Sequence, residues 1–96
     1  DVSEVTSMSY LFQATSYGVG EAAKLFNADI SRWDVSNVTD MMYMFDKAES
    51  FNCNLSSWNV KRVTDMSYMF SGARAFDKNT IKGWELKGKN TFYMFG

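Results

Sequence analysis

The feature that most constrains this chain is an internal repeat with a period of 25 residues. When the sequence is compared with itself at that shift, Phe26 coincides with Phe51 and Phe76. The run Thr-Asp-Met also recurs, and Tyr-Met-Phe follows it at the same distance each time. Self-similarity at a fixed period of this length is typical of proteins that stack one supersecondary unit. The sequence therefore predicts a stack of coils in which each coil contacts its neighbours.

The repeat divides the 96 residues into one domain of unequal parts. These are a partial first repeat (1–12), an insertion (13–25), two full repeats (26–50 and 51–75) and a degraded, truncated repeat (76–96). Solenoids need polar end caps for solubility, and the outer repeats show none. We therefore expect apolar residues of the outer coils to lack cover, namely Val2, Val5 and Met8 on one side and Trp84, Leu86 and Phe95 on the other.

The first half of each repeat has the periodicity of a short strand. Phe51, Cys53 and Leu55 alternate with polar residues, which is the pattern of a strand with one buried face. By this pattern Cys53 is a small apolar core residue, and no neighbour in the sequence would activate its thiol. The expected strands are residues 28–30, 53–55 and 79–81.

The second half of each repeat has a helical spacing. Val63, Met66 and Phe70 recur at intervals of three and four, and Thr64 is placed to cap the first turn. The expected short helices, α or 3-10, are residues 6–12, 39–45 and 64–70. Strand, bend, helix and return give a coil of about 25 residues, the size of a leucine-rich repeat. The predicted fold class is an α/β repeat, a right-handed leucine-rich-repeat-like solenoid with one short parallel strand and one short helix per coil.

Two strings of the sequence resemble a known family. They are FNADISRWDVSNVTDM (26–41) and VTDMSYMFSGA (63–73), which are similar to the degenerate repeat of the BspA-like leucine-rich-repeat surface proteins. The resemblance covers nearly the whole chain outside residues 13–25. It implies a leucine-rich-repeat-like solenoid in a cell-surface or secreted setting, with adhesive or partner-binding roles. The family offers no catalytic residues to carry over.

Composition excludes several classes of function. Ten basic residues against eleven acidic ones leave a net charge of −1, so no field attracts nucleic acid or an anionic membrane. The chain has no His and one Cys, so the commonest general base, the commonest neutral metal ligand and an internal disulfide are all missing. The longest apolar run, residues 41–45, is far too short to span a membrane. We predict a protein that is no enzyme, with no cofactor, no metal site, no nucleic-acid partner and no membrane span.

Aromatic residues provide the candidate interaction surface. One set recurs at the same place in each repeat, near the expected solvent side of the helix, and consists of Tyr10, Tyr43, Tyr68 and Tyr93. These rings would either contact a partner or close the edge of each coil as half-buried rings with a solvated hydroxyl. A second set lies at the bend, where tryptophans act as packing wedges or form an exposed column for protein or sugar, and consists of Trp33, Trp58 and Trp84. The core is expected to be filled by Met41, Met44, Phe45, Met66, Met69 and Phe70.

Two tripeptides fit the acceptor pattern for N-glycosylation. They begin at Asn37 and Asn54. Asn37 lies in the bend before the expected helix, so we expect it to be the more accessible acceptor. Asn54 lies in an expected strand and is the poorer one.

Two non-catalytic functions fit these features. The first is a repeat module for protein–protein interaction or adhesion, within a surface or extracellular protein that binds protein partners or a glycan. The second is a structural or accessory scaffold subunit of a larger assembly, either a head-to-tail filament or a multiprotein complex, in an organelle or within that complex. Self-association through uncapped coil ends is expected, because a soluble protein seldom leaves an apolar patch bare.

Overall fold

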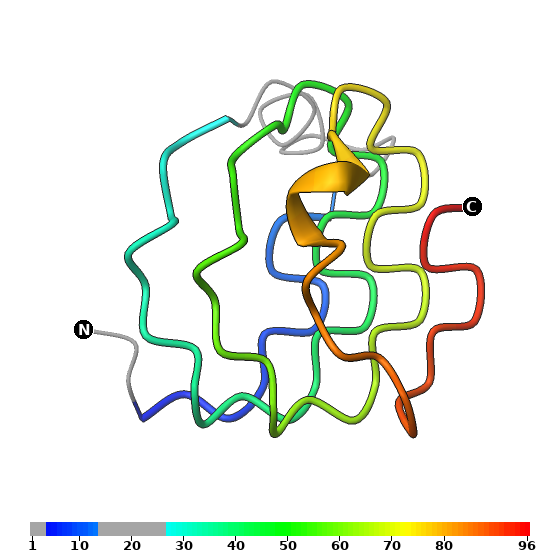
Figure 1. The fold of residues 1–96 in the computed structure, drawn as a ribbon. Coiled ribbons are helices and arrows are strands. Elements are labelled where there is room, and N and C mark those ends of the chain that lie inside the picture. Colours follow the sequence, from blue (N-terminus) through cyan, green and yellow to red (C-terminus); the bar gives the residue numbers. More distant parts are fainter. Residues whose placement is uncertain (1–3, 14–26) are drawn as a thin grey trace.

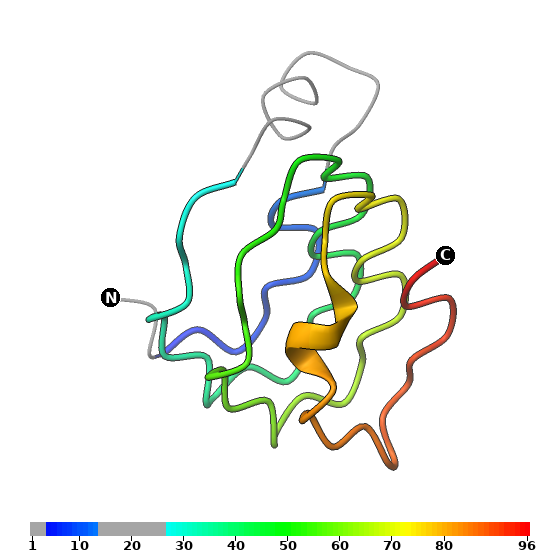
Figure 2. The same cartoon turned by 45° about the horizontal axis from the view of Figure 1, so that its top comes forward.

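The computed structural model describes residues 4–13 and 27–96, and both ribbon views show them as coils that lie side by side (Figures 1 and 2). Within those ranges the one helix is the 3-10 helix η1 (Lys78–Ile81), and no residue belongs to a strand. Neighbouring coils meet at parallel bridges that join Ser7 to Asp40, Asp40 to Asp65 and Asp65 to Asn90. The structure thus pairs equivalent positions of successive repeats. The expected insertion at 13–25 lies outside the described residues except for Gln13.

The expected helices are wrong, because their segments form successive tight turns. In the second coil the N–H of Met44 donates to the carbonyl oxygen of Met41, and the N–H of Asp46 donates to that of Tyr43, both at 3.2 Å. The equivalent tyrosines all have a positive φ, namely Tyr10 63°, Tyr43 59°, Tyr68 57° and Tyr93 49°. A left-handed residue cannot continue a right-handed helix, whereas a type II turn requires one at its third position. The corrected segments, 6–12, 39–45 and 64–70, zigzag along one side of the molecule (Figure 1), which we call the turn face.

Hydrogen bonds from alternate residues hold the coils together on the turn face. The N–H of Met41 donates to the carbonyl oxygen of Asp65 at 2.9 Å, and the N–H of Tyr43 donates to that of Ser67 at 3.0 Å. The N–H of Phe45 continues the series to Met69 at 2.8 Å. In this series each coil donates N–H groups to the following coil, and its carbonyl groups accept from the preceding one. One bond per coil runs the other way, since the N–H groups of Thr39 and Thr64 donate to the carbonyl oxygens of Thr6 and Thr39, both at 2.8 Å.

On the opposite face, side chains join the coils in place of the expected strands. The N–H of Asn52 donates to Oδ1 of Asn27 at 2.8 Å, and the N–H of Asp77 donates to Oδ1 of Asn52 at 3.0 Å. A side-chain amide between two backbones takes the place of the direct backbone ladder that defines a strand. Segments 28–30 and 53–55 are consequently not strands, and 79–81 lies in η1.

Asp and Asn side chains hold further bends of each coil, both at the corners and on the turn face. Oδ1 of Asp34 accepts the N–H of Ser36 at 3.0 Å, and Oδ1 of Asp65 accepts the N–H of Ser67 at 2.9 Å. Such Asx turns provide the backbone with a local partner where the chain changes direction. Thr64 is no helix cap, because its hydroxyl donates to the carbonyl oxygen of the preceding coil, at Thr39 (3.1 Å).

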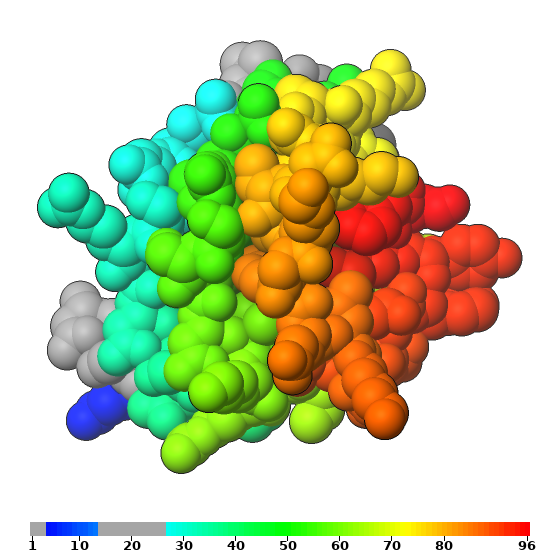
Figure 3. Space-filling view, in the orientation of Figure 1, coloured from blue at the N-terminus to red at the C-terminus, as the bar shows by residue number. Residues whose placement is uncertain are grey.

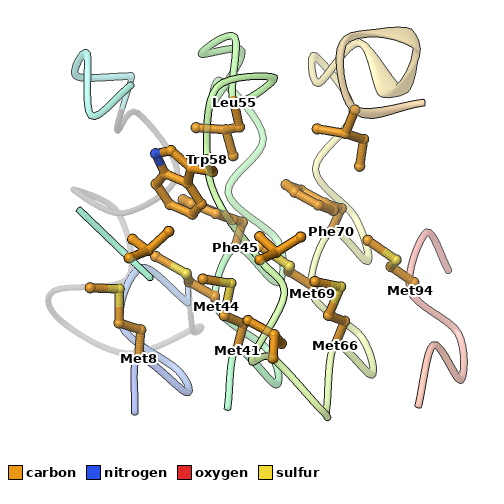
Figure 4. Close-up of a cluster of buried hydrophobic side chains, with 14 of the residues drawn as sticks. Met8, Met41, Met44, Phe45, Leu55, Trp58, Met66, Met69, Phe70 and Met94 are labelled. Atoms are coloured by element: carbon orange, nitrogen blue, oxygen red, sulfur yellow. The ribbon is translucent and has the colours of Figure 1, made fainter. Parts of the chain in front are cut away.

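The core lies between the two faces and is confirmed as predicted. The six expected residues, Met41, Met44, Phe45, Met66, Met69 and Phe70, are all at most 2% exposed, and methionines of successive coils follow one another across the interior (Figure 4). Phenylalanine rings also follow one another, with centroids 5.5 Å apart for Phe12–Phe45, 5.4 Å for Phe45–Phe70 and 5.8 Å for Phe70–Phe95. Each ring is nearly parallel to the next, so each coil covers its neighbour with the same residue type.

Candidate interaction surface

The four predicted tyrosines form one column, which we call the tyrosine column (Tyr10, Tyr43, Tyr68 and Tyr93). The rings of Tyr10 and Tyr43 are stacked at 4.9 Å and 6°, and those of Tyr43 and Tyr68 at 4.6 Å and 3°. Tyr93 continues the column at 5.5 Å with a 36° tilt. The inner two rings are half-buried and the outer two are exposed, at 49% for Tyr10 and 55% for Tyr93. The column presents ring edges to solvent along the turn face.

The backbone conformation turns these rings outward at an energetic cost. A left-handed φ costs a non-glycine residue about 1–2 kcal/mol. Each stacked aromatic pair stabilises the fold by about 0.5–1.5 kcal/mol. This gain offsets the strain only when the rings of successive coils lie in register. The pKa of Tyr43 is raised by burial, by the neighbouring Tyr68 and Tyr10, and by Asp46. These effects all favour the protonated hydroxyl of Tyr43.

Of the two alternatives expected for the tryptophans, Trp58 and Trp84 follow the first: they are packing wedges and not an exposed column. Trp58 is 4% exposed and Trp84 is 8% exposed. The Nε1 of Trp58 donates to the carbonyl oxygen of Ile30 at 3.0 Å, and that of Trp84 donates to Leu55 at 3.2 Å. Trp33 is half-buried against Phe12, with ring centroids 5.8 Å apart. The indoles of Trp58 and Trp84 thus fill corners of the core and bond the preceding coil.

The expected order of accessibility of the two asparagines is reversed. Asn37 is half-buried, and its Oδ1 accepts a hydrogen bond from Arg62 at 2.8 Å. Asn54 is exposed, because it lies at a corner and its Oδ1 accepts the N–H of Ser56 at 2.9 Å. Of the two, Asn54 offers its amide nitrogen more freely to solvent.

A polar hollow of about 470 Å³ lies beside Cys53, on the face opposite the tyrosine column. Its lining is mostly polar and includes Asn27, Asp29, Asn52, Asn54, Ser56 and Ser57. The thiol of Cys53 is half-buried, with Sγ 3.6 Å from Oδ1 of Asp29, and burial raises its pKa. A thiol held in its protonated form is a poor nucleophile. In the part of the chain that the structure describes, no group of His, Cys, Asp and Glu is arranged to hold a metal ion.

The expectation that apolar residues of the two outer coils lack cover is partly wrong. Met8 and Trp84 are buried, at 3% and 8% exposure, because the coil beside each one covers it. Val5 and Leu86 are half-buried, and Val2 lies outside the described residues. Phe95 is exposed as expected, and the other exposed large apolar side chains of the described residues also lie on the turn face of the two outer coils, namely Tyr10, Leu11, Phe92 and Tyr93.

Sequence reasoning missed a further set of groups, which belong to the backbone. The last coil carries N–H groups, and the first coil carries carbonyl groups, that have no partner among the described residues. The only sequence signal for them is the repeat itself, since the interior coils bond the same groups. None of the described helices is long or apolar enough to cross a membrane.

The sequence matches the family described as "Mycoplasma protein of unknown function, DUF285" over residues 1–96, and the chain belongs to that family. No curated protein and no solved structure matches it.

Proposed function

We propose that this DUF285 member is a non-catalytic repeat module for protein–protein interaction or adhesion, within a surface or extracellular protein. The tyrosine column carries the proposal. Four repeats each place a tyrosine in a strained left-handed conformation with its ring toward solvent. Tyrosine is enriched at interfaces because it offers a large, stiff contact area and a hydroxyl donor. If the position served packing alone, glycine or asparagine would occupy it at a lower conformational cost, because both tolerate a positive φ.

The setting of the proposed module rests on two further supports. The repeats resemble those of the BspA-like surface proteins, and the DUF285 family is associated with that group. Protease treatment of intact cells that carry the full protein tests the setting. Loss of this segment without cell lysis is expected, and full protection would contradict a surface location.

Substitution within the column tests the binding role. Peptides selected from a random display library on the folded chain serve as the probe, and their affinity is measured for Tyr43→Asn and Tyr68→Asn. Asparagine is chosen because it accepts a left-handed φ, so the turns should persist. We expect affinity to fall at least about tenfold, which corresponds to about 1.4 kcal/mol.

The matched control is Asn54→Ser, on the opposite face, where serine can still accept the corner hydrogen bond. This variant should bind the peptides as the unaltered chain does. If the selected peptides bind both tyrosine variants with unchanged affinity, the column is not the binding surface and the proposal fails.

A scaffold role is the alternative function, and the exposed aromatic groups of the outer coils favour it. In such a role the chain would be a structural or accessory subunit whose coil ends meet other subunits. Phe92 is 60% exposed and Phe95 is 45% exposed, which is unusual for phenylalanine in a protein of this size.

A further inference from the structure

The polar hollow beside Cys53 lies between the second and third coils, where a side chain joins the two backbones. Asn27 belongs to the second coil, and its Oδ1 accepts the N–H of Asn52 in the third coil at 2.8 Å. An amide inserted between two backbones keeps them further apart than a direct backbone hydrogen bond would. Ala28 and Cys53 also line the hollow, and their small side chains leave it open. Figure 3 shows the two coils, in cyan and green, side by side on the face that it displays.

Hydrogen bonds within the fold fix the direction of two amide groups in this lining. Oδ1 of Asn27 accepts the N–H of Asn52, and Oδ1 of Asn52 accepts the N–H of Asp77 at 3.0 Å. The opposite orientation of either amide would place two N–H groups against each other, because the oxygen is the acceptor of the group. Nδ2 of Asn27 and Nδ2 of Asn52 have no partner among the described residues. The hollow is therefore lined by two donors of fixed orientation.

Asp29 adds an acceptor beside these donors. Its Oδ1 accepts both the hydroxyl and the N–H of Ser31, at 2.6 and 3.0 Å, and these bonds lower the pKa of the carboxyl group. The carboxylate is therefore ionised at neutral pH. Its second oxygen, Oδ2, has no partner in the described part of the chain. Two amide donors and one charged acceptor are thus held in place by bonds that need no ligand.

The chemistry of the lining selects the class of ligand. None of the described residues that line the hollow is Lys or Arg, and Asp29 repels an anion. A divalent cation needs six to eight oxygen ligands, and the described residues contain no acidic group arranged to hold a metal. An apolar ligand would leave the amides and the carboxylate without partners, at a cost in free energy. A neutral ligand whose neighbouring groups both donate and accept, as hydroxyl groups do, fits all three residues.

We propose that this hollow binds a neutral saccharide, and that Asn27, Asn52 and Asp29 hold two neighbouring hydroxyl groups of one sugar ring. The hydroxyls would accept from the two Nδ2 groups and donate to Oδ2 of Asp29, so no polar group of the three side chains stays unpaired. The volume of about 470 Å³ lies within the range of about 300–1,000 Å³ that is typical of small-molecule sites. The hollow is on the face opposite the tyrosine column, so the inference stands apart from peptide binding at Tyr43 and Tyr68.

The labelling rate of Cys53 reports whether the hollow is occupied, because this is the only cysteine in the chain and it lines the hollow. The rate of alkylation by iodoacetamide is measured with and without glucose, galactose, mannose or N-acetylglucosamine. Mildly alkaline pH is used, since burial raises the pKa of this thiol. A sugar that binds with a Kd of about 10 mM should halve the rate at about 10 mM. We expect at least one of the four to do so, and the chain unfolded in urea should show no such effect.

Two substitutions each remove one ligand-binding group and keep the bond that holds the fold. Asn52→Asp keeps the oxygen that accepts from Asp77, and Asp29→Asn keeps the oxygen that accepts from Ser31. The native chain has the same exchanges one repeat later, with Asp77 in place of Asn52 and Asn54 in place of Asp29. Each variant should bind the protecting sugar at least about tenfold more weakly. Protection is the ratio of the rates with and without sugar in one variant, so a change in the reactivity of the thiol itself cancels.

Asn59→Asp is the matched control, because it adds the same charge at an exposed corner outside this hollow, where the preceding repeat has Asp34. It should be protected as the unaltered chain is. The proposal is overturned if none of the four sugars slows the labelling of the folded chain, or if both variants of the site keep full protection. If a variant loses the circular dichroism of the native fold, the side-chain amide resonances of Asn27 and Asn52 in the unaltered chain provide a second test. They should shift when the protecting sugar is added, and unchanged resonances contradict the assignment of the site.

Discussion

Replacing Phe70 with alanine should cost more free energy of unfolding than replacing Tyr68, two residues earlier. The Phe70 ring is 2% exposed and lies parallel to those of Phe45 and Phe76, with centroids 5.4 and 4.0 Å away. Its removal leaves a cavity that the coils on both sides cannot fill without losing their register. Truncation of a buried phenylalanine of this kind costs about 3–5 kcal/mol. Domains of this size have only about 5–15 kcal/mol in total, so Phe70→Ala should be marginally folded.

The loss at Tyr68 is smaller because one edge of its ring already contacts water. Alanine there removes the stacked pair with Tyr43, the tilted pair with Tyr93 and the edge-on pair with Phe92, at 4.6, 5.5 and 6.0 Å. The last two pairs are not stacked, so at about 0.5–1.5 kcal/mol for each aromatic pair the expected cost is about 2–3 kcal/mol. The backbone strain stays the same, since alanine is also a non-glycine residue at a positive φ.

Urea titrations followed by tryptophan fluorescence measure both losses, because Trp58 and Trp84 are buried in the native state. The difference is taken from the midpoints, provided that the slopes agree. Phe70→Leu serves as the control and should lose much less than Phe70→Ala, since it keeps most of the buried volume. Equal losses for Phe70→Ala and Tyr68→Ala would show that the assignment of inner and outer positions on the turn face is mistaken.

Two further predictions concern one turn and one corner. Gly72→Ala should lower the free energy of unfolding by about 1–2 kcal/mol, and with it the melting temperature. Gly72 has a φ of 74°, and a Cβ there would lie 3.3 Å from Cα of Lys47. An unchanged melting temperature would contradict the left-handed turn. The pKa of Asp34 is lowered by hydrogen bonds from Ser36. The carboxylate therefore stabilises the fold above its unfolded-state pKa, and this stabilisation is lost as the pH falls through the folded-state pKa. Ser36→Ala should therefore reduce the loss of stability at acid pH, and an unchanged loss would show that the Asp34–Ser36 hydrogen bonds do not contribute to it.

The period, the pairing of equivalent residues and the core could be predicted from the sequence, because identical side chains at one shift can bury themselves against each other. The local structure could not. Met41, Met44 and Phe45 have helical spacing, yet tight turns closed by bonds from the fourth residue to the first also bring such positions to one side. The spacing alone does not distinguish the two conformations. The one available signal was Gly72, which takes the place of Lys47 of the preceding repeat and shares its positive φ.

The candidate interaction surface could likewise be predicted only in part from the sequence. That the tyrosines form a column follows from the repeat, whereas their outward direction depends on the left-handed turns, which tyrosine rarely adopts. The two interpretations of the tryptophans, as packing wedges or as an exposed column, could not be separated from the sequence, because it does not show that the indole N–H groups of Trp58 and Trp84 reach carbonyl groups of the preceding coil. Asn54 was expected in a strand, and its exposure follows from the corner that its own side chain builds.

The conformational cost of the turns links the proposed binding surface to the stacking of the coils. An isolated coil would bear about 1–2 kcal/mol of strain at its tyrosine with no ring to stack on. Tyr43 and Tyr68 recover that cost because each has a ring on both sides, while Tyr10 and Tyr93 have one each. Tyr43 and Tyr68 are therefore the best supported part of the proposed binding surface, and the substitutions to asparagine test the surface at those two positions.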